Sequence, residues 1–105
     1  KSEVTKVMQA KLDVGMALAC DPTLLLMDEP MAGMGPGGTV KLSEIILGLK
    51  GTLTILLVEH DMDVVFSLAD RITVLVYGQA VATGTPDAIR ANPDVRRAYL
   101  GEDGD

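Results

Sequence analysis

The spacing of apolar residues predicts a helix as the first element, over residues 5–20. Apolar side chains recur there at close to the helical period of 3.6 residues, which predicts that they face the core. These residues are Met8, Leu12, Met16 and Ala19. Asp21-Pro22 ends the pattern, because a residue before proline is disfavoured in the helical region. Cys20 closes the apolar pattern, and we interpret it as a small buried side chain.

Two short apolar runs predict strands that are buried on both faces. They cover Leu24 to Met27 and Leu53 to Val58, and each is continuous rather than alternating. Between them, the segment GMGPGG from Gly33 predicts a loop. A second helix is expected after it, ending at Gly51, with an apolar side formed by Leu42, Ile45, Ile46 and Leu49.

The second half of the chain predicts a short capped helix, a hairpin and two closing helices. Asp61 is a good N-cap. Residues 72–77 and 80–83 flank Gly78-Gln79, a candidate two-residue turn. Thr85-Pro86 and Asn92-Pro93 each place a cap residue before a proline at the first helical position. Residues 101–105, GEDGD, are predicted to be a frayed tail. Together these elements indicate an α/β fold with a mostly parallel sheet and a C-terminal β-hairpin.

Composition limits the classes of function. A length of 105 residues suits one domain. The net charge of −6 and only three aromatic residues argue against a nucleic-acid partner. No apolar run approaches the roughly 18 residues that a membrane span needs, and the N-terminus has no signal-peptide core. We therefore expect a cytoplasmic protein.

Asp28 and Glu29 stand at the carboxyl end of the first predicted strand, where open parallel sheets bind their ligands. An acid there can hold Mg²⁺ while the metal contacts nucleotide phosphates. Its neighbour can accept a proton from a water that attacks the terminal phosphate. The alternative is that both acids only mark the point where a strand reaches solvent.

Glu59, His60 and Asp61 follow the second predicted strand in the same manner. His60 is the single histidine, and an imidazole at this place can donate a hydrogen bond to a phosphate. A lone histidine after a strand is also commonly a surface or capping residue. Glu59 is expected to be a solvated neighbour and Asp61 a helix cap.

In combination, these motifs resemble the nucleotide-binding domain of ABC transporters. The stretches are LLLMDEP, MAGMGP, LLVEHDMDVV and LADRITVLVYGQ. The resemblance covers about residues 12–102 and implies a partial P-loop NTPase-like (RecA-like) core. It implies that Asp28 is the magnesium acid of a Walker B motif, Glu29 the catalytic glutamate and His60 the switch histidine. Gly33, Met34 and Gly35 fall in the D-loop, with Gly35 where many members carry Asp.

Within this family, the ending GTPDAIRANPDVRRAYLGE is most like ATPase subunits of branched-chain amino-acid importers. Urea and lipopolysaccharide-export ATPases share parts of this ending. The resemblance implies a second ATPase subunit and membrane permease subunits as partners, and a place on the inner face of the membrane. ATP and Mg²⁺ are the implied cofactors.

Two family elements do not occur in the 105 residues. The phosphate loop GxxxxGK[ST] is missing, and residues 4–8 read VTKVM where the family carries its LSGGQ signature. We therefore interpret residues 1–105 as a single truncated domain in which residues 1–11 are divergent. The resemblance places the missing parts upstream of Lys1. Alone, the chain is expected to bind Mg-ATP only at about millimolar concentration and not to hydrolyse it.

Two hypotheses remain open. The chain is either the C-terminal part of an importer ATPase or a free-standing truncated relative without nucleotide turnover, which acts as a self-associating module. The truncated chain by itself is expected to self-associate, because strands buried on both faces need neighbours that a chain this short does not supply.

Overall fold

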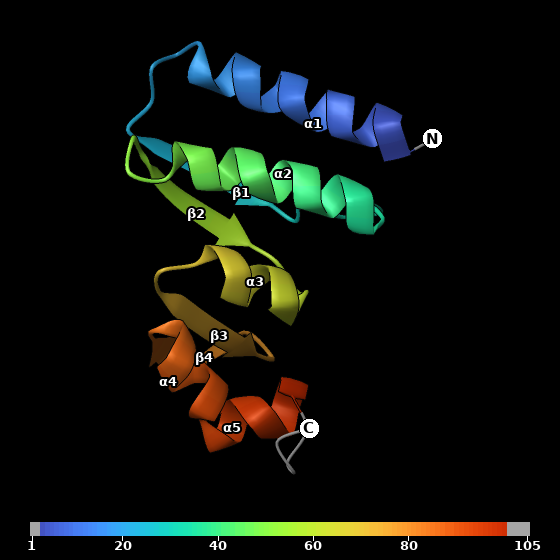
Figure 1. The fold of residues 1–105 in the computed structure, drawn as a ribbon. Coiled ribbons are helices and arrows are strands. Elements are labelled where there is room, and N and C mark those ends of the chain that lie inside the picture. The colour runs from blue at the N-terminus through green and yellow to red at the C-terminus, as the bar shows by residue number, and fades with distance from the viewer. Residues whose placement is uncertain (1–2, 101–105) are drawn as a thin grey trace. The chain divides into compact units, whose positions relative to one another are not determined.

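The computed structural model describes residues 3–100 of the chain, and it divides into two compact units, residues 1–60 and 61–105. The first unit contains α1 (Glu3–Leu18), β1 (Leu24–Asp28), α2 (Pro36–Leu49) and β2 (Thr54–Val58), as Figure 1 shows. The second contains α3 (Met62–Leu68), β3 (Ile72–Val76), β4 (Gln79–Gly84), α4 (Pro86–Ala91), α5 (Pro93–Val95) and a π-helical turn, η1 (Arg96–Leu100). The predicted tail at residues 101–105 lies outside the described residues.

The first unit is built on a two-stranded parallel sheet. β1 and β2 pair in register from Leu24 opposite Thr54 to Asp28 opposite Val58. The helix α2 lies over this sheet and α1 runs alongside α2 (Figure 1). Leu42 and Ile46 of α2 are fully buried, and Leu25 and Met27, at alternate positions of β1, are at most 8% exposed. The register of β1 on β2 confirms the predicted parallel pairing.

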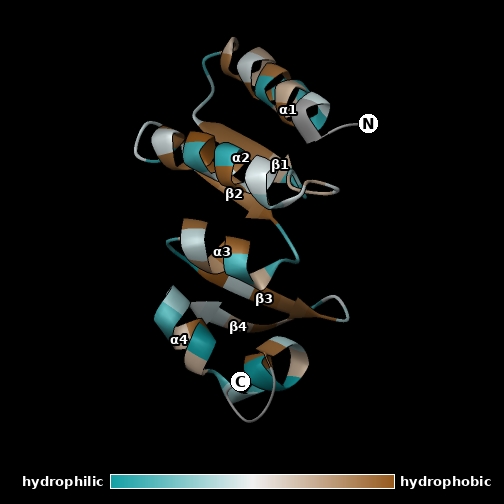
Figure 2. Cartoon of the chain, turned by 45° about the vertical axis from the view of Figure 1, so that its right-hand side comes forward, coloured by the Kyte–Doolittle hydropathy of each residue, from teal (hydrophilic) through white to brown (hydrophobic). Residues whose placement is uncertain are grey.

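The prediction that both strands are buried on both faces is wrong. Alternate residues of β1 and β2 are exposed, because among the described residues only one face of the sheet is covered. Four large apolar side chains share the open face, with exposed fractions of 50–65%: Leu24, Leu26, Leu56 and Val58. Figure 2 shows both strands as strongly hydrophobic ribbons. We call these four residues the open sheet face.

The helix α1 forms as predicted but buries a different side. Val7 and Val14, two turns apart, are buried, whereas Met8, Leu12 and Met16 are about 60% exposed. The predicted core stripe is therefore wrong, and Cys20 is exposed rather than buried. The stripe has the right period, but α1 packs mainly against α2 in the described part of this unit, and one helical neighbour covers only a narrow strip of a helix.

The boundaries of α2 and of the hairpin differ by a few residues from those predicted. The helix α2 begins at Pro36, inside the segment predicted as a loop, because proline suits the first helical position. The hairpin turn is Tyr77-Gly78 rather than Gly78-Gln79, since Val76 pairs with Gln79. Tyr77 and Gly78 both have positive φ, 50° and 77°, which matches the twist of a type I′ turn.

The second unit has a closed core. Its buried cluster consists of Ile72, Val74, Ile89 and Val95, none more than 6% exposed. The predicted caps are confirmed: Asp61 accepts from Asp63 N and Val64 N, and Thr85 and Asn92 cap α4 and α5. In the part of the chain from residue 3 to 100, no helix has the length and apolarity to cross a membrane.

Candidate functional site

The carboxyl ends of β1 and β2 bring four polar residues to one edge of the sheet. Asp28 pairs with Val58, so the residues that follow each strand emerge side by side. Glu29 N donates to Val58 O at 2.7 Å, which fixes the two strand ends to each other. We call Asp28, Glu29, Glu59 and His60 the strand-end cluster. Sequence reasoning placed these residues at strand ends, and the parallel register brings them together.

Glu29 and His60 face each other across this edge. His60 Nε2 lies 3.4 Å from Glu29 Oε1, with side-chain exposures of 75% and 48%. This is a long contact, and both groups remain accessible to a ligand. Glu29 has a φ of +48°, which is uncommon for a residue with a side chain and turns the chain sharply after β1. The pair combines a carboxylate that can accept a proton with an imidazole that can donate a hydrogen bond.

The prediction that Glu59 is a solvated neighbour is wrong. Its side chain is half-buried, and Oε2 accepts a hydrogen bond of 3.0 Å from Met31 N. Glu59 thus connects the end of β2 to the turn that follows Glu29. One feature of the sequence pointed to this contact. Glu59 follows β2, and the neighbouring parallel strand, β1, leads directly into a turn that contains Pro30.

The predicted D-loop segment, Gly33 to Gly35, follows in a tight turn. Met34 N donates to Met31 O at 3.0 Å, and Gly33 has a φ of +73°. Gly33 O accepts from Lys6 Nζ at 2.8 Å, so α1 contacts this segment directly. A side chain at Gly33 would meet the Lys6 ammonium at 2.6 Å. The positive φ favours glycine here, whereas the flexible end of the Lys6 side chain can move away from an added side chain.

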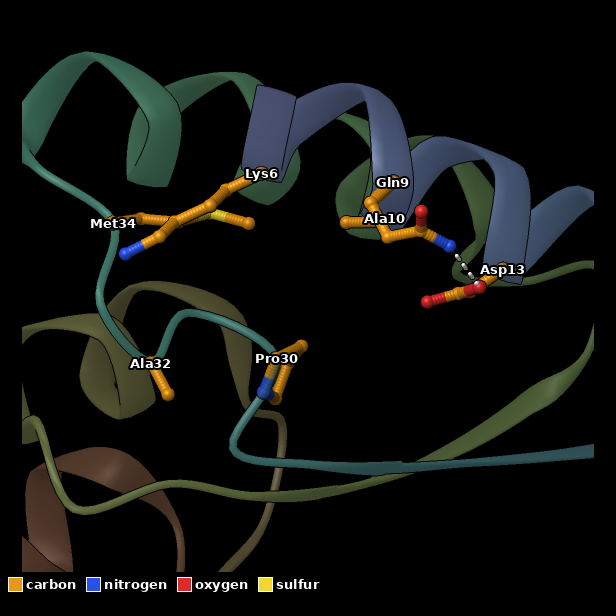
Figure 3. Close-up of a pocket in the computed structure, with 7 residues that line it drawn as sticks. All are labelled: Lys6, Gln9, Ala10, Asp13, Pro30, Ala32 and Met34. Carbon is orange, nitrogen blue, oxygen red and sulfur yellow. Dashed lines mark hydrogen bonds between the residues drawn. The ribbon is translucent and has the colours of Figure 1, made fainter. Parts of the chain in front are cut away.

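An open pocket of about 310 Å³ lies between α1 and this turn (Figure 3). Its lining comes from the two segments in almost equal parts: Lys6, Gln9, Ala10, Asp13, Pro30, Ala32 and Met34. The strand-end cluster does not line it. The acids and His60 therefore lie at the exposed strand ends, whereas the pocket lies where α1 packs against residues 30–34.

Asp28 is an exposed carboxylate at the end of β1. Within residues 3–100, no group of three or more His, Cys, Asp or Glu side chains is arranged to hold a metal ion. A single carboxylate nevertheless fits Mg²⁺, which keeps several waters and takes further oxygen ligands from nucleotide phosphates. Asp28 would hold such an ion, whose chemistry is to neutralise phosphate charge.

The sequence matches known transport ATPases. Residues 81–105 match the family of branched-chain amino acid ATP-binding cassette transporters. The chain is 47% identical over 96 residues to LivG of Escherichia coli (strain K12), a high-affinity branched-chain amino acid transport ATP-binding protein. This alignment covers 90% of the chain and 38% of LivG. BraF of Pseudomonas aeruginosa, a protein of the same description, is 44% identical with the same coverage of both chains.

The fold matches solved structures of the same kind. One is the ADP conformation of MJ1267, an ATP-binding cassette of an ABC transporter: the TM-score is 0.78 at 32% identity, covering 91% of this chain and 40% of that one. A nucleotide-free ATP-binding cassette gives a TM-score of 0.78 at 30% identity, with coverages of 92% and 40%.

Sequence and fold together confirm the predicted fold class, and the chain belongs to the ATP-binding cassette family of ATPases. Within that family, it resembles the ATP-binding proteins of branched-chain amino acid transport, and it spans 38% of the length of those relatives. The resemblance seen in the motifs is thereby confirmed. The single-domain interpretation of residues 1–105 and the roles of individual side chains stay predictions.

Proposed function

We propose that this chain is the C-terminal part of the ATP-hydrolysing subunit of an ABC importer for branched-chain amino acids. The observation that carries the proposal is the Glu29–His60 pair, held 3.4 Å apart where two parallel strands end. The 47% identity to LivG supports the same assignment. The partners of such a subunit are a second ATPase subunit and membrane permease subunits, at the inner face of the membrane.

The proposed roles of Glu29 and His60 follow from the chemistry of their side chains. Glu29 accepts a proton from the water that attacks the terminal phosphate, because an ionised carboxylate offers acceptor oxygens only. His60 donates a hydrogen bond to the phosphate oxygen on which charge develops. Asp28 holds Mg²⁺, and Gly33 to Gly35 contact the second ATPase subunit. Without a phosphate loop in these residues, we propose that the chain alone does not bind ATP productively.

A chimera tests this proposal. The matching 96-residue segment of Escherichia coli LivG is replaced by the segment of this chain, and ATP hydrolysis is measured together with nucleotide binding. Glu29→Gln should abolish turnover and leave ATP binding intact, since an amide cannot accept the proton. His60→Ala should lower turnover by about a hundredfold, as loss of one preorganised donor does.

The matched control is Glu44→Gln, the same chemical change on an exposed residue of α2. It should leave turnover unchanged. Near-normal hydrolysis by the Glu29→Gln chimera would show that another group accepts the proton.

We also propose that the chain by itself associates with a second copy through the open sheet face. This face presents four large apolar side chains, each at least half exposed. Within the described residues, β1 and β2 each pair on one side only, which leaves backbone donors and acceptors along both edges. Association would cover apolar surface and sheet edges together.

A further inference from the structure

Glu59 holds the turn that follows Glu29. Its Oε2 accepts from Met31 N at 3.0 Å, a bond between a carboxylate and a backbone N–H, which is stronger than a bond between neutral groups. Met31 is only 6% exposed. A backbone N–H on a buried residue needs a partner, and in this chain a side chain from the neighbouring strand supplies it.

The turn needs such support because Glu29 adopts an unfavourable backbone conformation. A φ of +48° is uncommon for a residue with a side chain, because the Cβ atom crowds the backbone there. Such conformations persist where the surroundings fix them. Two hydrogen bonds do so here, one on each side of Pro30: Glu29 N to Val58 O and Met31 N to Glu59 Oε2.

Both acceptors come from one short segment. Val58 and Glu59 hold the turn, and His60, the next residue, faces Glu29. The distance between the carboxylate of Glu29 and the imidazole of His60 therefore depends on the segment that also holds the turn. A displacement of either strand end would change this distance.

We propose that Glu59 is a positioning residue, which fixes Glu29 opposite His60 by holding the N–H of Met31. The catalytic consequence rests on the proposed function, whereas the hydrogen bond itself can be tested on the chain alone. Glu59 acts through the backbone of the turn and exchanges no proton with a substrate.

NMR on the chain tests the hydrogen bond. In Glu59→Leu the acceptor is lost, and hydrogen exchange at the Met31 amide should accelerate at least tenfold relative to the amide of Leu26 in β1. The imidazole signal of His60, the single histidine, should shift with it. Glu59→Gln retains a side-chain oxygen and should restore both readouts to within about twofold of wild type, since an amide oxygen still accepts.

Lys6→Met is the matched control, because it removes a different side-chain hydrogen bond to the chain just after this turn, the one to Gly33 O. It should leave exchange at Met31 unchanged. If Glu59→Leu does not fold, Glu59→Ala replaces it. Unchanged exchange at Met31 in the Leu or Ala variant, or failure of Glu59→Gln to restore it, overturns the proposal.

The LivG chimera separates this proposal from the proposed function. Glu59→Leu should lower kcat by between about ten- and a hundredfold with little change in KM, because a misplaced catalytic group loses orientation rather than substrate affinity. Glu59→Gln should restore kcat. If Glu29→Gln keeps its activity while the NMR result holds, the proposed function fails and the role of Glu59 in the turn stands. If Glu29→Gln is inactive and Glu59→Leu has normal kcat, the positioning role fails alone.

Discussion

The two units use similar apolar side chains with opposite results. In residues 61–100, a hairpin and short helices enclose Ile72, Val74, Ile89 and Val95, and these side chains are at most 6% exposed. In residues 3–60, helix α2 covers only one face of a two-stranded sheet, and the side chains of the open sheet face remain 50–65% exposed. The difference is not one of composition. A strand rich in apolar residues is buried only as far as neighbouring elements cover it.

Helix capping also differs between the units, and again the second unit is the better satisfied one. Each of α3, α4 and α5 begins at a side chain that accepts backbone N–H groups. The N-cap residue of α2 in the first unit is Gly35, which has no side chain to accept such a bond. The second unit thus has side-chain caps on its helices and a buried core. The first unit contains the candidate functional residues, and one face of its sheet is exposed.

The largest expected effect is at the closed core. Ile89→Ala should lower the free energy of unfolding by about 2–5 kcal/mol, because it leaves a cavity at a side chain that is 1% exposed. Urea unfolding followed by circular dichroism measures it. Leu75→Ala, at a site 55% exposed in the same unit, is the control and should change stability by no more than about 0.5 kcal/mol. Equal losses at both sites would contradict the closed core.

The next effect concerns the open sheet face. The chain should form a dimer or larger assembly at micromolar concentration, measured by size-exclusion chromatography with light scattering. Leu26→Thr combined with Leu56→Thr should weaken association at least tenfold, because threonine keeps the strand conformation but removes apolar area. A monomer of 11.1 kDa across this range would refute the proposal.

Leu75→Thr is the matched control for this experiment. Leu75 is as exposed as the leucines of the open sheet face but lies on β3 in the second unit. It should leave the assembly state unchanged. If it weakens association as much as the double variant, the contact does not belong to the sheet of the first unit.

The smallest effect should come from capping α2. Gly35 has a φ of −80°, so any residue fits its backbone conformation. Gly35→Asp should raise stability by a few tenths of a kcal/mol over wild type, and by about 1 kcal/mol over Gly35→Ala, since aspartate accepts from the first turn of the helix. Urea midpoints measure both differences. A stability of Gly35→Asp no higher than that of Gly35→Ala would show that the start of α2 is already satisfied by other groups.

Features that depend on near neighbours in the chain could be predicted from the amino-acid sequence. Asp61, Thr85 and Asn92 cap helices as predicted, because a cap needs only the two or three residues that follow it. The two apolar runs form parallel strands, and the polar residues after them meet at one edge as the alternation of strands and helices implies. The family follows from the same motifs.

Which surfaces are covered, and which distant groups meet, depends on how the helices and strands pack. The helical period of α1 could be recognised in the sequence. The position of α2, however, determines that Val7 and Val14 are buried and that Met8, Leu12 and Met16 are exposed. A continuous apolar sequence is compatible with a strand covered on one face or on both, so the exposure of β1 and β2 could not be predicted from it. The bond from Met31 to Glu59 joins residues 28 positions apart, and only the register of β1 on β2 brings them within 3.0 Å. Local sequence fixes backbone conformation, whereas burial and partner choice depend on residues distant along the chain.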